Sequence, residues 1–129
     1  MDHPTLIVLL ALLQYVFFTG RVGMARGKYK VEAPACDGDE NFNRLFRVQQ
    51  NTLEQLVIFI PASYAFAYYL STLWVLIPGV VFILGRFLYS AEYEKDPKTR
   101  GPGMGLTLLA NVVLVLGALF GLLRVMFFS

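Results

Sequence analysis

The chain has 129 residues, of which 57% are hydrophobic and only 16% are charged. Its 11 Lys and Arg residues exceed the 9 acidic residues by two, so the composition offers no general basic field for nucleic acid. With one histidine and one cysteine, the chain has neither an internal disulfide nor a thiolate metal cluster, and we expect no metal site.

Long stretches without Asp, Glu, Lys or Arg dominate the sequence, namely residues 3–20, 55–85 and 101–123. About 20 apolar residues cross a bilayer as a helix. We therefore predict an all-α integral membrane protein, with one domain over residues 1–129. Its transmembrane helices are expected over about 5–25, 44–70, 74–94 and 104–127. Such an up-down four-helix bundle places both termini on one side of the membrane. Gly117 and Gly121 form a small-residue pair on the last helix that favours close helix packing.

The cationic residues indicate how this bundle is oriented. They gather in and beside the first and third connections, as Arg21, Arg26, Lys28, Lys30, Arg44, Arg47, Lys95, Lys98 and Arg100. The positive-inside rule places these two connections in the cytoplasm and both termini outside. The compact chain, which shows no retention signal, favours a bacterial inner membrane over an organelle membrane.

Polar side chains at membrane depth are costly, which makes each of them a candidate for function. Helical spacing groups them into two stripes near the cytoplasmic ends of their helices: Arg47, Asn51 and Glu54 with Gln50 beside them, and Arg86, Tyr89 and Tyr93. Taken alone, Glu54 and Arg86 are better explained as a buried ion pair that fixes helix packing. The whole set, with its guanidinium, carboxylate, amide and phenol groups, suits a zwitterionic or peptide-like ligand.

The start of the second helix carries a recognisable motif. Residues 42–54 read F-x-R-x-x-R-x-x-x-N-x-x-E, which resembles the signature of the membrane-associated proteins in eicosanoid and glutathione metabolism, the MAPEG superfamily. Residues 85–93 and 96–101 agree with the same superfamily, and the likeness is greatest to its microsomal glutathione transferase branch. The resemblance implies a homotrimer with three active sites at subunit interfaces, facing the cytoplasm, and glutathione as co-substrate.

The resemblance also implies a role for each polar residue. Glutathione would be held by Arg47, Asn51, Glu54, Tyr89 and Tyr93 of one subunit, and by Arg26 and Gln49 of its neighbour. Arg86 and Gln50 would hold these residues in place without contacting glutathione. Arg100 would stabilise the glutathione thiolate for attack on a lipophilic electrophile that enters from the membrane. Glutathione-dependent reduction of lipid hydroperoxides is a second activity to test.

Two positions depart from the family pattern, and two other functions stay open. Gln55 stands where several members have a tyrosine. Gly27 stands where the leukotriene-conjugating members have a second arginine, which argues against that lipid substrate. The alternatives are a non-catalytic lipid-binding scaffold of the same fold and a small multidrug or ion transporter in which Glu54 titrates. Arg47 and Arg100 favour the enzyme.

Overall fold

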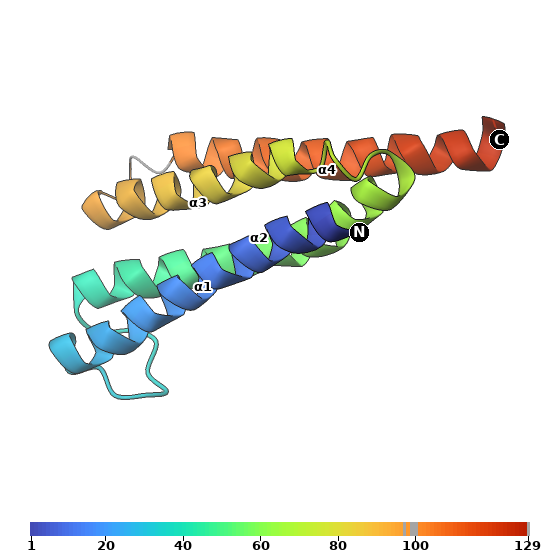
Figure 1. Ribbon diagram of the computed structural model, residues 1–129. Coiled ribbons are helices and arrows are strands. Elements are labelled where there is room, and N and C mark those ends of the chain that lie inside the picture. Colours follow the sequence, from blue (N-terminus) through green and yellow to red (C-terminus); the bar gives the residue numbers. More distant parts are fainter. Residues whose placement is uncertain (97, 99–100, 129) are drawn as a thin grey trace.

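Four long helices make up the part of the chain that the structure describes, residues 1–96, 98 and 101–128 of a computed structural model. They are α1 (Asp2–Tyr29), α2 (Glu40–Tyr69), α3 (Leu76–Lys95) and α4 (Gly101–Phe128), and the described residues contain no strand. The helices alternate in direction, so both termini lie at the end that carries the α2–α3 connection (Figure 1). The predicted all-α fold class is confirmed.

Three of these helices, α1, α3 and α4, are long and apolar enough to cross a membrane. Among the described helices α2 is the exception, because its first half carries the charged and amide residues of the predicted site. That α2 also crosses the membrane stays a prediction.

The first connection is shorter than the polar stretch 26–43 suggested. The helix α1 continues into this stretch and ends where Lys30 takes a left-handed backbone conformation, with φ of 56°. The next helix begins early because the Asp39 carboxylate accepts a hydrogen bond from the Asn41 N–H at 2.8 Å. A helix can extend beyond its apolar stretch at either end, because its backbone hydrogen bonds also form in water.

Aromatic and small side chains fill the interior of the bundle. Phe59 of α2 and Phe82 of α3 are fully buried and stack with their ring centroids 4.0 Å apart. A Cβ at Gly117 would lie 2.4 Å from the Phe66 ring, and one at Gly121 would lie 2.5 Å from a backbone carbonyl oxygen of α2. The glycine pair therefore provides the close helix packing that its spacing predicted.

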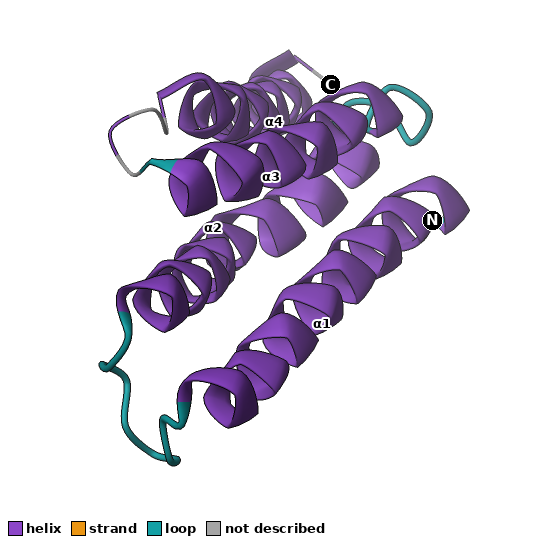
Figure 2. Ribbon diagram, turned by 90° about the vertical axis from the view of Figure 1, so that its left-hand side faces the viewer, coloured by secondary structure: helices purple, strands orange, loops and turns teal. Residues whose placement is uncertain are grey.

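The helices pair as two hairpins, α1 with α2 and α3 with α4 (Figure 2). The hairpins lie close together near the termini and diverge toward the end that carries the α1–α2 connection (Figure 1). The polar residues of the predicted site lie in the half of the bundle nearest this diverging end.

Candidate functional site

Arg86 is the fully buried centre of the polar residues. Its Nη2 donates to the Asn51 Oδ1 at 2.7 Å and its Nη1 donates to the Thr107 Oγ1 at 3.4 Å. The guanidinium also lies over the Tyr89 ring, 4.4 Å from the centroid. Among the described residues no carboxylate lies within ion-pair distance of it. One buried cation thus joins α3 to both α2 and α4 through neutral acceptors.

Glu54 does not pair with Arg86, so the explanation of these two residues as a buried ion pair is wrong. The Glu54 side chain is 57% exposed, and its Oε1 lies 3.9 Å from the Nη2 of Arg47, whose side chain is 51% exposed. At 3.6 residues per turn, positions 47, 51 and 54 spread over about 60° of the helix surface. Asn51 occupies the edge that faces α3, while the two charged residues face outward from the bundle.

Tyr89 and Tyr93 continue the site toward the end of α3. Their rings stack with centroids 5.5 Å apart, and Tyr89 is buried while Tyr93 is half-buried. A Cβ at Gly103 would lie 2.3 Å from the Tyr89 backbone nitrogen, so α4 approaches α3 closely at this level. The Gly103 N–H also donates to the Glu92 Oε1 at 2.8 Å, which fixes the start of α4 against α3.

The two residues expected to reach a neighbouring subunit make contacts within their own chain. The Arg26 Nη1 donates to the Ala35 carbonyl oxygen at 2.7 Å, and the guanidinium lies 5.1 Å from the centroid of the Phe42 ring. The Gln49 Nε2 donates to the Thr19 Oγ1 at 3.2 Å and so links α2 to α1. Both residues are half-buried.

Two further predicted residues complete the account. Gln50 is half-buried on α2. Arg100, the expected thiolate-stabilising residue, lies outside the described residues. Within the described part of the chain, no group of three or more His, Cys, Asp or Glu side chains is placed to hold a metal ion.

Sequence reasoning missed several polar links between helices. Gln55 accepts a hydrogen bond on its Oε1 from the Asn111 Nδ2 at 3.0 Å, which joins α2 to α4. Arg21 forms an ion pair with Glu94, from α1 to α3. Thr107 receives the second Arg86 hydrogen bond. The sequence pattern that could have indicated these links is a polar residue inside an apolar helix. Asn111 shows this pattern most clearly, because residues 101–123 contain no charged residue.

The fold and the motif on α2 define the class of this protein. The chain belongs to the MAPEG family, whose family model matches residues 4–120. An uncharacterized protein of Synechocystis is 43% identical over 120 residues, which cover 93% of this chain and 88% of that protein. Human microsomal glutathione S-transferase 2 is 38% identical over 114 residues, covering 88% of this chain and 78% of that protein. Bovine leukotriene C4 synthase is 26% identical over 117 residues, covering 91% and 78% respectively. The resemblance drawn from the α2 motif is confirmed.

Proposed function

We propose that this protein is a membrane-bound glutathione transferase that activates glutathione for attack on lipophilic electrophiles. The observation that carries the proposal is the pair Arg47 and Glu54, which stay exposed on a helix packed among apolar membrane helices. Opposite charges 3.9 Å apart offer partners to a carboxylate and to the ammonium of a γ-glutamyl group. The similarity to human microsomal glutathione S-transferase 2 supports the same choice of ligand.

Asn51 connects this exposed pair to the buried scaffold. Its Oδ1 accepts the Arg86 hydrogen bond, and among the described residues the two N–H groups of its amide have no acceptor, so both can donate to a glutathione carboxylate. Tyr89 and Tyr93 supply phenol groups on the facing helix. In this arrangement Arg86 positions Asn51, which binds glutathione, and does not itself contact glutathione.

The site is proposed to be completed in a homotrimer. An exposed charged face on a membrane helix needs a polar partner that lipid tails do not supply. Arg26 and Gln49 of a neighbouring subunit would provide it after turning away from their contacts within the chain. A detergent-solubilised mass of three copies supports this arrangement, whereas a monomeric or dimeric mass contradicts it.

Arg100 is proposed to hold the glutathione sulfur as a thiolate. A free thiol has a pKa of about 8.5 and is mostly protonated at neutral pH. A fixed cation lowers the pKa of the thiol, more strongly at a low-dielectric boundary, and an arginine stays charged there. The thiol proton passes to water, a sulfur electron pair forms the new C–S bond, and the leaving group departs with its electron pair.

The same thiolate would reduce a lipid hydroperoxide. The sulfur attacks the terminal peroxide oxygen and releases the lipid alcohol. A second glutathione then displaces water from the oxidised sulfur to give glutathione disulfide. Two glutathione molecules are thereby oxidised for each hydroperoxide reduced.

The proposed orientation follows from the cationic connections. All four helices, α2 included, would cross the membrane, with the α1–α2 and α3–α4 connections in the cytoplasm, where glutathione is dissolved. We place the protein in a bacterial inner membrane, in keeping with its 43% identity to the Synechocystis protein. Lipophilic acceptors would enter from the bilayer across exposed apolar side chains such as Leu116 and Phe120.

Glutathione conjugation to an electrophilic aromatic halide by the purified protein tests the enzyme. Arg100→Ala is expected to lower the rate about 100-fold, the usual effect of losing one stabilising group, while glutathione still binds. Lys98→Ala, an exposed cation in the same connection, is the matched control and should keep the wild-type rate. Wild-type protein without thiol-dependent turnover on several halides and hydroperoxides would contradict the proposal and favour a lipid-binding scaffold.

Glu54→Gln separates the transferase from a transporter. For the transferase, this variant should raise the KM for glutathione by about tenfold or more, because a charge-assisted hydrogen bond is lost. A transporter would instead lose proton-coupled uptake into vesicles in Glu54→Gln and keep it in Arg100→Ala. That result, together with unchanged conjugation in both variants, would favour the transporter.

A further inference from the structure

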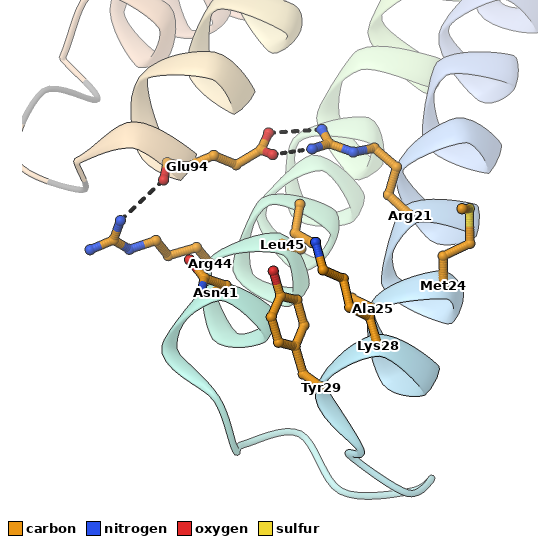
Figure 3. Close-up of a pocket in the computed structure, with 9 residues that line it drawn as sticks. All are labelled: Arg21, Met24, Ala25, Lys28, Tyr29, Asn41, Arg44, Leu45 and Glu94. Carbon is orange, nitrogen blue, oxygen red and sulfur yellow. Dashed lines mark hydrogen bonds and ion pairs between the residues drawn. The ribbon is translucent and has the colours of Figure 1, made fainter.

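A cavity with several charged side chains in its lining lies at the end of the bundle that carries the α1–α2 connection. It encloses about 380 Å³ between the end of α1, the start of α2 and the end of α3 (Figure 3). None of the described residues assigned above to glutathione lines it. Its charged lining consists of Arg21, Lys28, Arg44 and Glu94, an excess of two positive charges.

The one carboxylate of this lining is already occupied. Both Glu94 carboxylate oxygens accept hydrogen bonds from the Arg21 guanidinium, as Figure 3 shows, and the Oε2 also accepts one from Ser90. Arg44 is paired with Glu40, a residue that is 77% exposed and does not line the cavity. Lys28 has no ion pair among the described residues. Of the three cations that line the cavity, Lys28 is therefore the one that keeps an unpaired positive charge among the described residues.

Several donors at this site have no acceptor. Lys28 and Tyr29 extend from the end of α1 toward the space between Arg21 and Arg44 (Figure 3). Within the described residues, neither the Lys28 ammonium nor the Tyr29 hydroxyl donates a hydrogen bond, whereas the Arg44 guanidinium donates to Glu40 and to two backbone carbonyl oxygens of α3. The Lys28 ammonium and the Tyr29 hydroxyl together match an oxyanion with several acceptor oxygens, such as a phosphate.

A second cavity, lined by aromatic rings, adjoins the first. It encloses about 520 Å³, shares Arg21 and Glu94 with its neighbour, and is lined by Phe17, Phe18 and Phe87. Phe17 of α1 and Phe87 of α3 are about half exposed, and their ring centroids lie 6.5 Å apart. Phe17 lies about one turn deeper in α1 than Arg21, and Phe87 lies about two turns deeper in α3 than Glu94. A ligand with an apolar tail would use both cavities, whereas a free phosphate would gain nothing from the rings.

We propose that the paired cavities bind an anionic phospholipid. The Lys28 ammonium and the Tyr29 hydroxyl hold the phosphate, Arg44 lines the cavity beside them, and an acyl chain packs against Phe17 and Phe87. The ion pair of Arg21 with Glu94 forms the wall that the cavities share. Helix ends at a membrane boundary meet lipid headgroups, and anionic headgroups are attracted to Lys and Arg placed there. The binding requires neither glutathione nor the trimeric site.

Native mass spectrometry of the detergent-purified protein, titrated with phosphatidylglycerol or phosphatidylcholine of identical acyl chains, tests the proposal. The wild-type protein should retain phosphatidylglycerol in preference to phosphatidylcholine. Lys28→Gln should weaken phosphatidylglycerol binding about fivefold, the contribution of one cation near an anionic lipid, and leave phosphatidylcholine binding unchanged. Lys30→Gln is the matched control at the same helix end, since Lys30 is exposed and lies outside the cavity. It should bind like the wild type.

Further variants separate the two parts of the site. Phe87→Ala should weaken the binding of both lipids, and Lys28→Arg should restore what Lys28→Gln loses. Equal losses in Lys28→Gln and Lys30→Gln would indicate diffuse surface charge and overturn the site. Equal affinity for the two lipids would overturn the phosphate position. Displacement of the lipid by an equal concentration of inorganic phosphate would identify a free-phosphate site and overturn the lipid assignment. A helical circular dichroism spectrum for each variant confirms that it is folded.

Discussion

Replacing Asn51 by alanine removes the best acceptor of a buried guanidinium. The Arg86 Nη2 donates to it at 2.7 Å, the Thr107 contact is longer at 3.4 Å, and the Arg86 Nε has no partner among the described residues. A hydrogen bond to a charged group contributes about 1.5–3 kcal/mol, whereas interhelical hydrogen bonds in membranes average about 0.6 kcal/mol. Because Arg86 is fully buried, we expect the larger of these two contributions to apply. Asn51→Ala should lower the free energy of unfolding by about 2 kcal/mol.

A double-mutant cycle isolates this interaction. Arg86→Met keeps an unbranched side chain that reaches as far as the Arg Nε and carries no charge, and in that background Asn51→Ala should cost less than about 0.5 kcal/mol. Unfolding in mixed micelles with rising dodecyl sulfate measures each free energy. Leu53→Ala, an exposed position on the same helix, controls for the loss of side-chain volume. Costs of Asn51→Ala and Arg86→Met that simply add would refute the claim that the hydrogen bond joins α2 to α3.

Two other interhelical contacts lead to similar tests. Gly103→Ala should lower the free energy of unfolding by about 1–3 kcal/mol and raise the KM for glutathione, because its Cβ would meet the Tyr89 backbone. Gly105→Ala, whose Cβ would meet open space, should be neutral or slightly stabilising, and an equal loss there would contradict this account. Asn111→Leu should cost about 1 kcal/mol through loss of the 3.0 Å bond to Gln55. That cost should vanish when Gln55→Leu is already present, and its persistence would assign it to packing alone.

The helices could be predicted because their evidence is local. Charge-free stretches such as 55–85 and 101–123 are long enough to cross a bilayer, and no soluble alternative accommodates them in so short a chain. The spacing of Gly117 and Gly121 likewise placed both on one helix face, and the structure packs that face against α2. Each of these inferences needed only neighbours along the sequence.

The pairing within the site could not be predicted in the same way. A helical stripe identifies residues near one face but leaves open which edge of the stripe meets which neighbouring helix. Opposite charge suggested Glu54 as the partner of Arg86, whereas the edge that faces α3 carries Asn51. Arg21 was counted with the first connection, yet it lies within α1 and pairs with Glu94, 73 positions along the chain. Such long-range pairs depend on how the helices are rotated, which no local pattern records.

One edge of α2, which carries Asn51, contributes to stability, and the exposed face, which carries Arg47 and Glu54, serves the proposed function. Both Nη atoms of Arg86 donate to side chains of its own chain, and the residue therefore acts as scaffold for Asn51. Arg47 and Glu54 are more than half exposed, and an ion pair of this kind contributes little stability. A helix kept only for packing therefore has little need of this pair. A ligand that carries both a carboxylate and an ammonium needs both charges where they stand. The exposed pair on α2, rather than the buried arginine of α3, is therefore the feature that a glutathione site explains.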